Sequence, residues 1–141
     1  MKTILKYLSV ITFLALIHFS AKADDLGKLS GKWMVEKENT EGQKYKQVLE
    51  FKEKTFKFWI KSPQGQTMIY AEGAAKIQKV NDLHLLMLKD IKAGESETNI
   101  SAIYDDRTIV YRMGYKTMTV ATNFESSRDE DPEIDIYKKV E

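Results

Sequence analysis

The sequence lacks cysteine altogether and contains only two prolines and two histidines among its 141 residues. Without cysteine the chain forms no disulfide, carries no thiol nucleophile and offers no thiolate to a metal. His18 falls in the N-terminal apolar segment, which leaves His84 as the one histidine of the remaining chain. Zinc or copper sites built from several histidines and cysteines are therefore excluded, and we expect neither a metal nor a cofactor.

Long hydrophobic runs are also scarce, and the one near the N-terminus has the form of a secretory signal. Lys2 and Lys6 precede the apolar residues 8–19, and Ala21-Lys22-Ala23 follows them. A bilayer span needs about 20 predominantly apolar residues, so a signal peptide over residues 1–23 is favoured over a retained anchor. We expect cleavage before Asp24 and a secreted or periplasmic protein with no stable membrane anchor.

Neither sign of charge dominates, since 22 lysines and arginines face 21 aspartates and glutamates. The lysines are interleaved with acids, as in Lys52-Glu53-Lys54. Nucleic acid normally meets a clustered basic face, so we expect no nucleic-acid partner. The size of residues 24–141 is that of one domain, which we expect to be a monomer.

Apolar and polar residues alternate along most of the chain after residue 23, and no segment shows a helical stripe. A period of two is typical of half-buried strands. The segments that show it are residues 32–38, 45–51, 55–61, 66–72, 74–80, 83–88, 99–104, 108–113, 117–122 and 133–140. Turn-forming sequences separate them, including Ser62-Pro63-Gln64-Gly65 and the polar residues 93–97, which we interpret as loops.

About nine short, evenly spaced strands predict an all-β sandwich or barrel. No helix follows a strand to make a parallel crossover, so the sheet should be antiparallel and meandering. Closing such a sheet removes its two unpaired edges. We therefore predict a single antiparallel up-and-down β-barrel of about 8 to 9 strands over residues 24–141.

The segment Leu29-Ser30-Gly31-Lys32-Trp33 places a glycine two residues before a tryptophan at the start of the first expected strand. This motif resembles the opening motif of lipocalins and other calycins, and the strand layout resembles that of small bacterial lipocalin-like proteins. The resemblance implies a ligand-binding barrel in which Trp33 plugs the closed end. It also implies a basic side chain, Lys138 or Lys139, against that ring, where the family more usually has arginine.

No arrangement of residues predicts catalysis, so we expect that the protein is not an enzyme. His84 lies in an apolar run, and no serine has a nucleophile-elbow pattern. No two acidic residues can be identified from the sequence as a catalytic carboxylate pair. Asp129-Glu130-Asp131 lacks the glycine and the ligand spacing of a calcium loop. Asn99-Ile100-Ser101 is a formal glycan acceptor, which matters only in a host that glycosylates exported chains.

Two functions stay open at this point. The first is binding of a small apolar or amphipathic ligand in the lumen, for which the candidate residues are Phe58, Tyr70, Tyr104, Tyr111 and Arg112. The second is a filled barrel that acts as a protein-interaction or inhibitor module in the cell envelope. If Phe58 points inward, Trp59 should be exposed on the outer face and available to such a partner.

Overall fold

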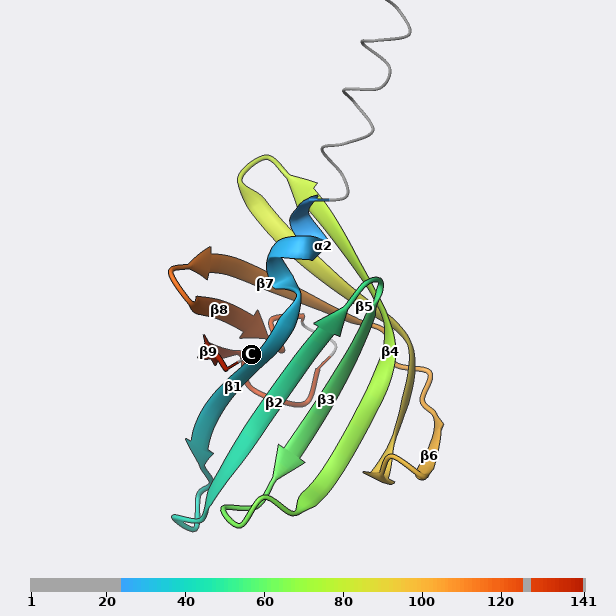
Figure 1. Cartoon of the computed structure of the whole chain (residues 1–141), viewed down its shortest axis with the longest axis vertical. Coiled ribbons are helices and arrows are strands. Elements are labelled where there is room, and N and C mark those ends of the chain that lie inside the picture. Colours follow the sequence, from blue (N-terminus) through green and yellow to red (C-terminus); the bar gives the residue numbers. More distant parts are fainter. Residues whose placement is uncertain (1–23, 126–127, 141) are drawn as a thin grey trace, which may run out of the picture.

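The strands form one sheet that closes on itself (Figure 1). Alternate side chains of these strands are buried in the one core that the sheet encloses. The computed structural model describes residues 24–125 and 128–140, so the leader predicted over residues 1–23 lies outside the described residues. The elements are α2 (Asp24–Leu29), β1 (Gly31–Glu38), β2 (Lys44–Lys52), β3 (Thr55–Lys61), β4 (Thr67–Val80), β5 (Leu83–Ser96), β6 (Asn99–Ala102), β7 (Arg107–Gly114), β8 (Thr117–Thr122) and β9 (Glu133–Lys139).

All strand pairings in this sheet are antiparallel, and the spatial order is β4-β3-β2-β1-β9-β8-β7-β5-β6. Pairing of β4 with β5 closes a barrel of eight strands, while β6 is an extra strand on the last part of β5. The first strand meets the last through Trp33 opposite Lys139 and Met34 opposite Lys138. The predicted antiparallel up-and-down barrel is confirmed.

The two ends of the barrel are built differently. Because the strands alternate in direction, α2 lies at the same end as the short turns β2–β3, β4–β5 and β7–β8 and the end of β9. We call this the closed end, and Figure 1 shows α2 and the tip of the β4–β5 hairpin there, at the top. The longer connections, such as β1–β2, β3–β4 and β8–β9, lie at the opposite end, which we call the mouth.

The closed end is sealed by a small apolar plug. Leu29 of α2 is fully buried and Trp33 is 1% exposed. The Trp33 indole Nε1 donates a hydrogen bond to the Leu29 carbonyl oxygen at 2.8 Å, so the one polar atom of the ring is satisfied inside the core. This helix was not expected, because its six residues are too few to show a helical stripe and only Leu29 among 26–29 is buried.

The strand boundary expected at Gly73 is wrong. Gly73 does not end a strand, since β4 runs through it for 14 residues. A Cβ there would lie 2.5 Å from the Lys89 carbonyl oxygen and 2.9 Å from Cε1 of Phe56. The glycine therefore permits a close approach of β5 and Phe56 beside an irregularity in the β4–β5 register, which is a common use of glycine within strands.

The polar residues 93–97 are not a loop. Residues 93–96 continue β5: Ala93 and Gly94 pair with both β4 and β6, and Ser96 pairs with Asn99 of β6. This pairing satisfies backbone groups of the polar segment, which its side-chain pattern does not reveal. Within residues 24–125 and 128–140, no helix is long and apolar enough to cross a membrane.

Candidate functional site

Inward-facing side chains become more exposed from the closed end toward the mouth. On β1 Trp33 is buried, whereas Val35 and Lys37 are half-buried. The next inner row runs from Trp33 and Leu49, which are buried, to Phe58, Ala71 and Ala93, and the row after it, nearer the mouth, contains Val35, Gln47, Ile60 and Ile69. Most members of these two rows are half-buried, and Ile69 is exposed, while Phe51 and Phe56 nearer the closed end are 2% and 3% exposed. The lumen is therefore filled at the closed end and opens toward the mouth.

A hollow of about 570 Å³ lies at the mouth, on the side of β2 and β3. Its lining residues are Asn39, Gln43, Lys44, Tyr45, Ile60, Ser62, Pro63 and Met68. Tyr45 and Ile60 belong to the inner wall, and Met68 is 54% exposed at the rim. The volume lies within the range of about 300 to 1,000 Å³ that is usual for small-molecule sites.

Polar groups enter the inner wall beside this hollow. The Lys37 ammonium contacts Asp135 at 2.9 Å and Glu133 at 2.5 Å. Burial opposes the charge of Lys37, but hydrogen bonds to Glu133 and Asp135 outweigh it and raise the pKa of the ammonium. The Tyr137 hydroxyl donates to Gln47 Oε1 at 2.8 Å, and burial raises the pKa of that hydroxyl. Hydrogen-bonding groups thus lie beside the half-buried side chains of Val35, Tyr45, Phe58, Ile60 and Ala71, the part of the inner wall that we call the cup.

A second set of ion pairs ties the segment after β8 to the loop before β7. Arg128 Nη1 contacts the Asp105 carboxylate at 2.6 Å, and Arg107 Nη2 contacts it at 3.0 Å. Arg128 also donates to the Asp106 carbonyl oxygen at 3.1 Å. The hydrogen bond from Arg128 and that from Arg107 outweigh the effect of burial and hold the pKa of Asp105 below its usual range.

Charge is divided between the two ends of the barrel, although the sequence interleaves the signs. The closed end holds Lys28, Lys52, Lys54, Lys76, Lys79, Lys89, Arg112, Lys116, Lys138 and Lys139 with the acids Glu53, Asp82 and Asp90. The mouth holds Glu36, Glu38, Glu41, Glu95, Glu97, Asp105, Asp106, Glu125, Asp129, Glu130, Asp131, Glu133 and Asp135 with the bases Lys37, Lys44, Lys46, Lys61, Arg107 and Arg128. The closed end is basic and the mouth is acidic.

The five residues predicted to bind a ligand do not come together. Phe58 faces the lumen, and Tyr111 is buried there with its ring centroid 5.5 Å from that of His84. Tyr70 is buried on the outer wall, Arg112 is exposed on the outer wall, and Tyr104 is fully exposed outside the barrel. Phe58 is the member that lies nearest the hollow, in the row next to Ile60.

Of the two lysines that the resemblance places against the Trp33 ring, Lys139 lies there and Lys138 does not. The Lys139 ammonium lies over the Trp33 ring, 5.4 Å from its centroid. Lys138 points to the opposite face and pairs across the sheet with Met34, where both side chains are on the outer wall. Lys139, not Lys138, therefore supplies the cation, because it shares the inward register of Trp33 and Tyr137.

Trp59 is not the exposed aromatic that its outward position suggested. Phe58 does point inward, yet Trp59 is only 7% exposed. The ring packs against Tyr70 with centroids 5.5 Å apart, Lys61 covers it, and Nε1 donates to Glu97 at 3.2 Å. The extension of β5 beyond Gly94 brings Glu97 to this place, so the unexpected length of β5 explains the burial.

No protein-family model, curated protein or solved structure matches this chain. Its function is accordingly inferred from its own residues. Among the described residues, no three histidine, aspartate or glutamate side chains are grouped so that they could hold a metal ion.

The sequence did not single out the polar residues of the mouth. Lys37 and Asp135 occupy inward positions of strands whose other inward residues include Trp33, Val35 and Tyr137. A charge at an inward position of a period-two strand is a usable signal, since a buried charge needs a partner. The pairing of Lys37 with Asp135, 98 positions apart, depends on closure of the barrel between β1 and β9.

Proposed function

We propose that this protein is a lipocalin-like binding protein that holds the apolar part of a small amphipathic ligand in the mouth of its barrel. The observation that carries the proposal is the change in exposure along the inner wall, from a solid closed end to a half-exposed cup. Ala71 and Ala93 are small side chains in the row of Phe58, half-buried on this part of the inner wall. Concave walls of mainly apolar side chains with a few polar groups are the usual form of small-molecule sites.

The polar part of the ligand would lie at the rim and would be cationic or rich in hydrogen-bond donors. Several cations of the mouth are engaged, Lys37 with Glu133 and Asp135, and Arg107 and Arg128 with Asp105, while Lys44 lines the hollow itself. The remaining carboxylates leave an excess of negative charge around the opening. A carboxylate-bearing ligand would be repelled, whereas an ammonium group would be attracted.

Calorimetric titration with decylamine, decanol and decanoate tests this proposal, because the three probes share an alkyl chain and differ in the head group. Decylamine should bind most tightly and decanoate most weakly. Binding of decylamine should weaken as salt is raised, since its head group is held partly by charge.

Two substitutions of the same kind distinguish the cup from the outer wall. Ala71→Phe fills the cup, whereas Ala121→Phe adds the same ring on the outer wall, in the row of Val110 and Ile134. Ala71→Phe should lower decylamine affinity by about tenfold or more, because a ring takes the volume of several methylenes, and Ala121→Phe should leave it unchanged. Ile60→Ser at the mouth is a second variant that should weaken binding even if Ala71→Phe disturbs folding.

Equal effects of the two alanine substitutions in folded proteins would rule the cup out, as would no binding of any of the three probes. A preference for decanoate over decylamine would leave the cup but overturn the assignment of the head group.

A protein-interaction module is the second candidate, and one observation favours it. The outer wall of β5, β7, β8 and β9 carries the apolar row Leu85, Val110, Ala121 and Ile134, and Ile134 and Ile136 are 71% and 57% exposed. Exposed aliphatic rows on a sheet are often covered by a partner protein. Capture of one envelope protein by the parent chain, lost in Ile134→Lys with the fold intact, would support this function in place of the first.

A further inference from the structure

We propose that the closed end of the barrel docks on an anionic lipid bilayer, with the tip of the β4–β5 hairpin in the headgroup region and the mouth facing away. This inference does not depend on what the mouth binds. It is based on exposed apolar side chains at the hairpin tips, on the lysines around them and on the separation of charge along the barrel.

The β4–β5 hairpin extends beyond its neighbours at the closed end. Pairing of β3 with β4 ends at Ala74, whereas β4 continues to Val80, which pairs with Leu83. In Figure 1 the tip of this hairpin stands at the top of the molecule, next to α2. The hairpin is therefore the part of the closed end that reaches a flat surface first.

The tip of this hairpin carries aliphatic side chains that are open to solvent. Val80 and Leu83, which flank the turn at Asn81 and Asp82, are 48% and 47% exposed. Tyr115, in the β7–β8 turn at the same end, is 88% exposed. Short aliphatic side chains and tyrosine at protruding tips are the residues that enter the interface between headgroups and acyl chains.

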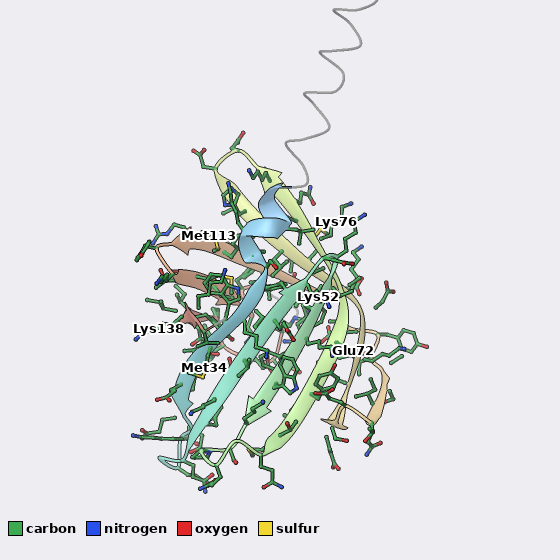
Figure 2. All side chains as sticks on the ribbon, viewed as in Figure 1. Met34, Lys52, Glu72, Lys76, Met113 and Lys138 are labelled. Carbon is green, nitrogen blue, oxygen red and sulfur yellow. The ribbon has the colours of Figure 1, made fainter. Side chains whose placement is uncertain are left out.

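Lysines accompany these apolar tips. Lys76 is exposed on β4 four residues before Val80, and Lys116 is exposed beside Tyr115. Figure 2 shows Lys76 beside the upper part of β4 and Lys52 at the end of β2, both toward the closed end. Basic side chains next to an apolar tip favour anionic over neutral lipid surfaces.

The acidic mouth sets the orientation. An anionic surface attracts the basic end and repels the carboxylates of the mouth, such as Glu130 and Asp131, so the barrel would stand with its opening toward water. A nucleic acid is a weaker match for the same end, because single strands are held by stacking on successive aromatic rings, whereas the protruding tip carries the aliphatic Val80 and Leu83 and Tyr115 is a single ring on another turn.

Co-sedimentation with vesicles tests the proposal. We would compare vesicles of phosphatidylcholine with vesicles that also contain one quarter phosphatidylglycerol, using the chain as the expressing cell produces it and the same N-terminus for every variant. The parent should bind the anionic vesicles about tenfold or more tightly than the neutral ones, and the difference should shrink at high salt.

Two double variants distinguish an effect of the lysines at the closed end from an effect of the net charge of the protein. Lys76→Glu with Lys116→Glu at the closed end and Lys44→Glu with Lys46→Glu at the mouth change the net charge equally. The first pair should lower binding to anionic vesicles by about tenfold or more, and the second should change it far less. Leu83→Asn should also weaken binding, whereas Ile134→Asn on the outer wall should not.

Equal loss in the two charge-reversed proteins would overturn the proposal, and so would equal binding of the parent to both kinds of vesicle. Binding to a single-stranded DNA oligomer with none to the vesicles would overturn it in favour of a nucleic acid. None of these outcomes bears on the alkyl probes, so failure here and failure of the proposed cup are distinguishable.

Discussion

At the scale of single residues, the inner wall of the mouth combines a nearly buried ion pair with an apolar cup. The side chains of Lys37 and Asp135 are 11% and 15% exposed. At such burial a charge is tolerated only with its partner, so removal of one member leaves the other uncompensated. The ion pair between Lys46 and Glu36 on the outer wall is longer and more exposed. Its charged groups are 3.7 Å apart, and the two side chains are 37% and 65% exposed.

Lys37→Met should lower the free energy of unfolding by about 2 to 3 kcal/mol, because it leaves the carboxylates of Glu133 and Asp135 without a cation. Lys46→Met should change it by less than about 0.5 kcal/mol. Urea unfolding at pH 7 measures both. The pKa of Lys37 is raised by folding, so its contribution is present below the usual lysine value of about 10.4 and is lost as pH rises through the higher folded value. Equal losses in the two variants would contradict this role of Lys37.

Asp105 gives the opposite dependence on pH. Its pKa is lowered by Arg128 and Arg107, so its contribution to stability is present above the usual aspartate value of about 3.9 and is lost as pH falls through the folded value. Asp105→Asn should therefore lower the melting temperature at pH 7, and the difference from the parent should disappear in strong acid. Asp106→Asn, at the adjacent exposed carboxylate, is the control and should shift the melting temperature less. A difference that persists unchanged at acidic pH would refute the ion-pair explanation.

At the scale of elements, the alternation of side chains predicted most strands, and the errors have physical causes. The segments 32–38, 45–51, 55–61 and 117–122 correspond closely to β1, β2, β3 and β8. Gly73 and the polar residues 93–97 misled the prediction, because strand continuity there depends on pairing with distant segments. The burial of Trp59 could not be predicted for the same reason, since Glu97 and Tyr70 reach it only after β4, β5 and β6 have paired.

Two glycine substitutions should have opposite effects on stability. Gly73→Ala should destabilise the barrel by about 1 to 3 kcal/mol, because the new Cβ would press on the Lys89 carbonyl oxygen and the Phe56 ring. Gly27→Ala in α2 meets no atom within 4 Å and should stabilise the helix by about 0.5 to 1 kcal/mol. Thermal unfolding of the two variants measures both. A neutral Gly73→Ala would show that β4 and β5 separate easily at this point.

At the scale of the whole molecule, closure of the sheet gives the barrel its polarity. In a meander of antiparallel strands, every second connection lies at the same end of the barrel. Lysines that alternate with acids along the sequence are thereby brought together around the closed end. The two signs of charge are therefore evenly mixed along the sequence, whereas the folded barrel is basic at the closed end and acidic at the mouth. The closed barrel and the plug residue Trp33 were predictable from the sequence. The site at the mouth was not, because its walls come from β1, β2, β3 and β9 and its ion pair joins the two strands that close the sheet.

We propose that the inner wall near the mouth is a binding cup. Nuclear magnetic resonance titration of the ¹⁵N-labelled protein with decylamine can locate the bound probe, because each amide reports on its own surroundings. We expect saturable shifts in the amides of Tyr45, Ile60 and Ala71, with none in those of Val110 and Ile134 on the outer wall. Shifts confined to the outer wall, or none in the cup at saturating probe, would contradict it.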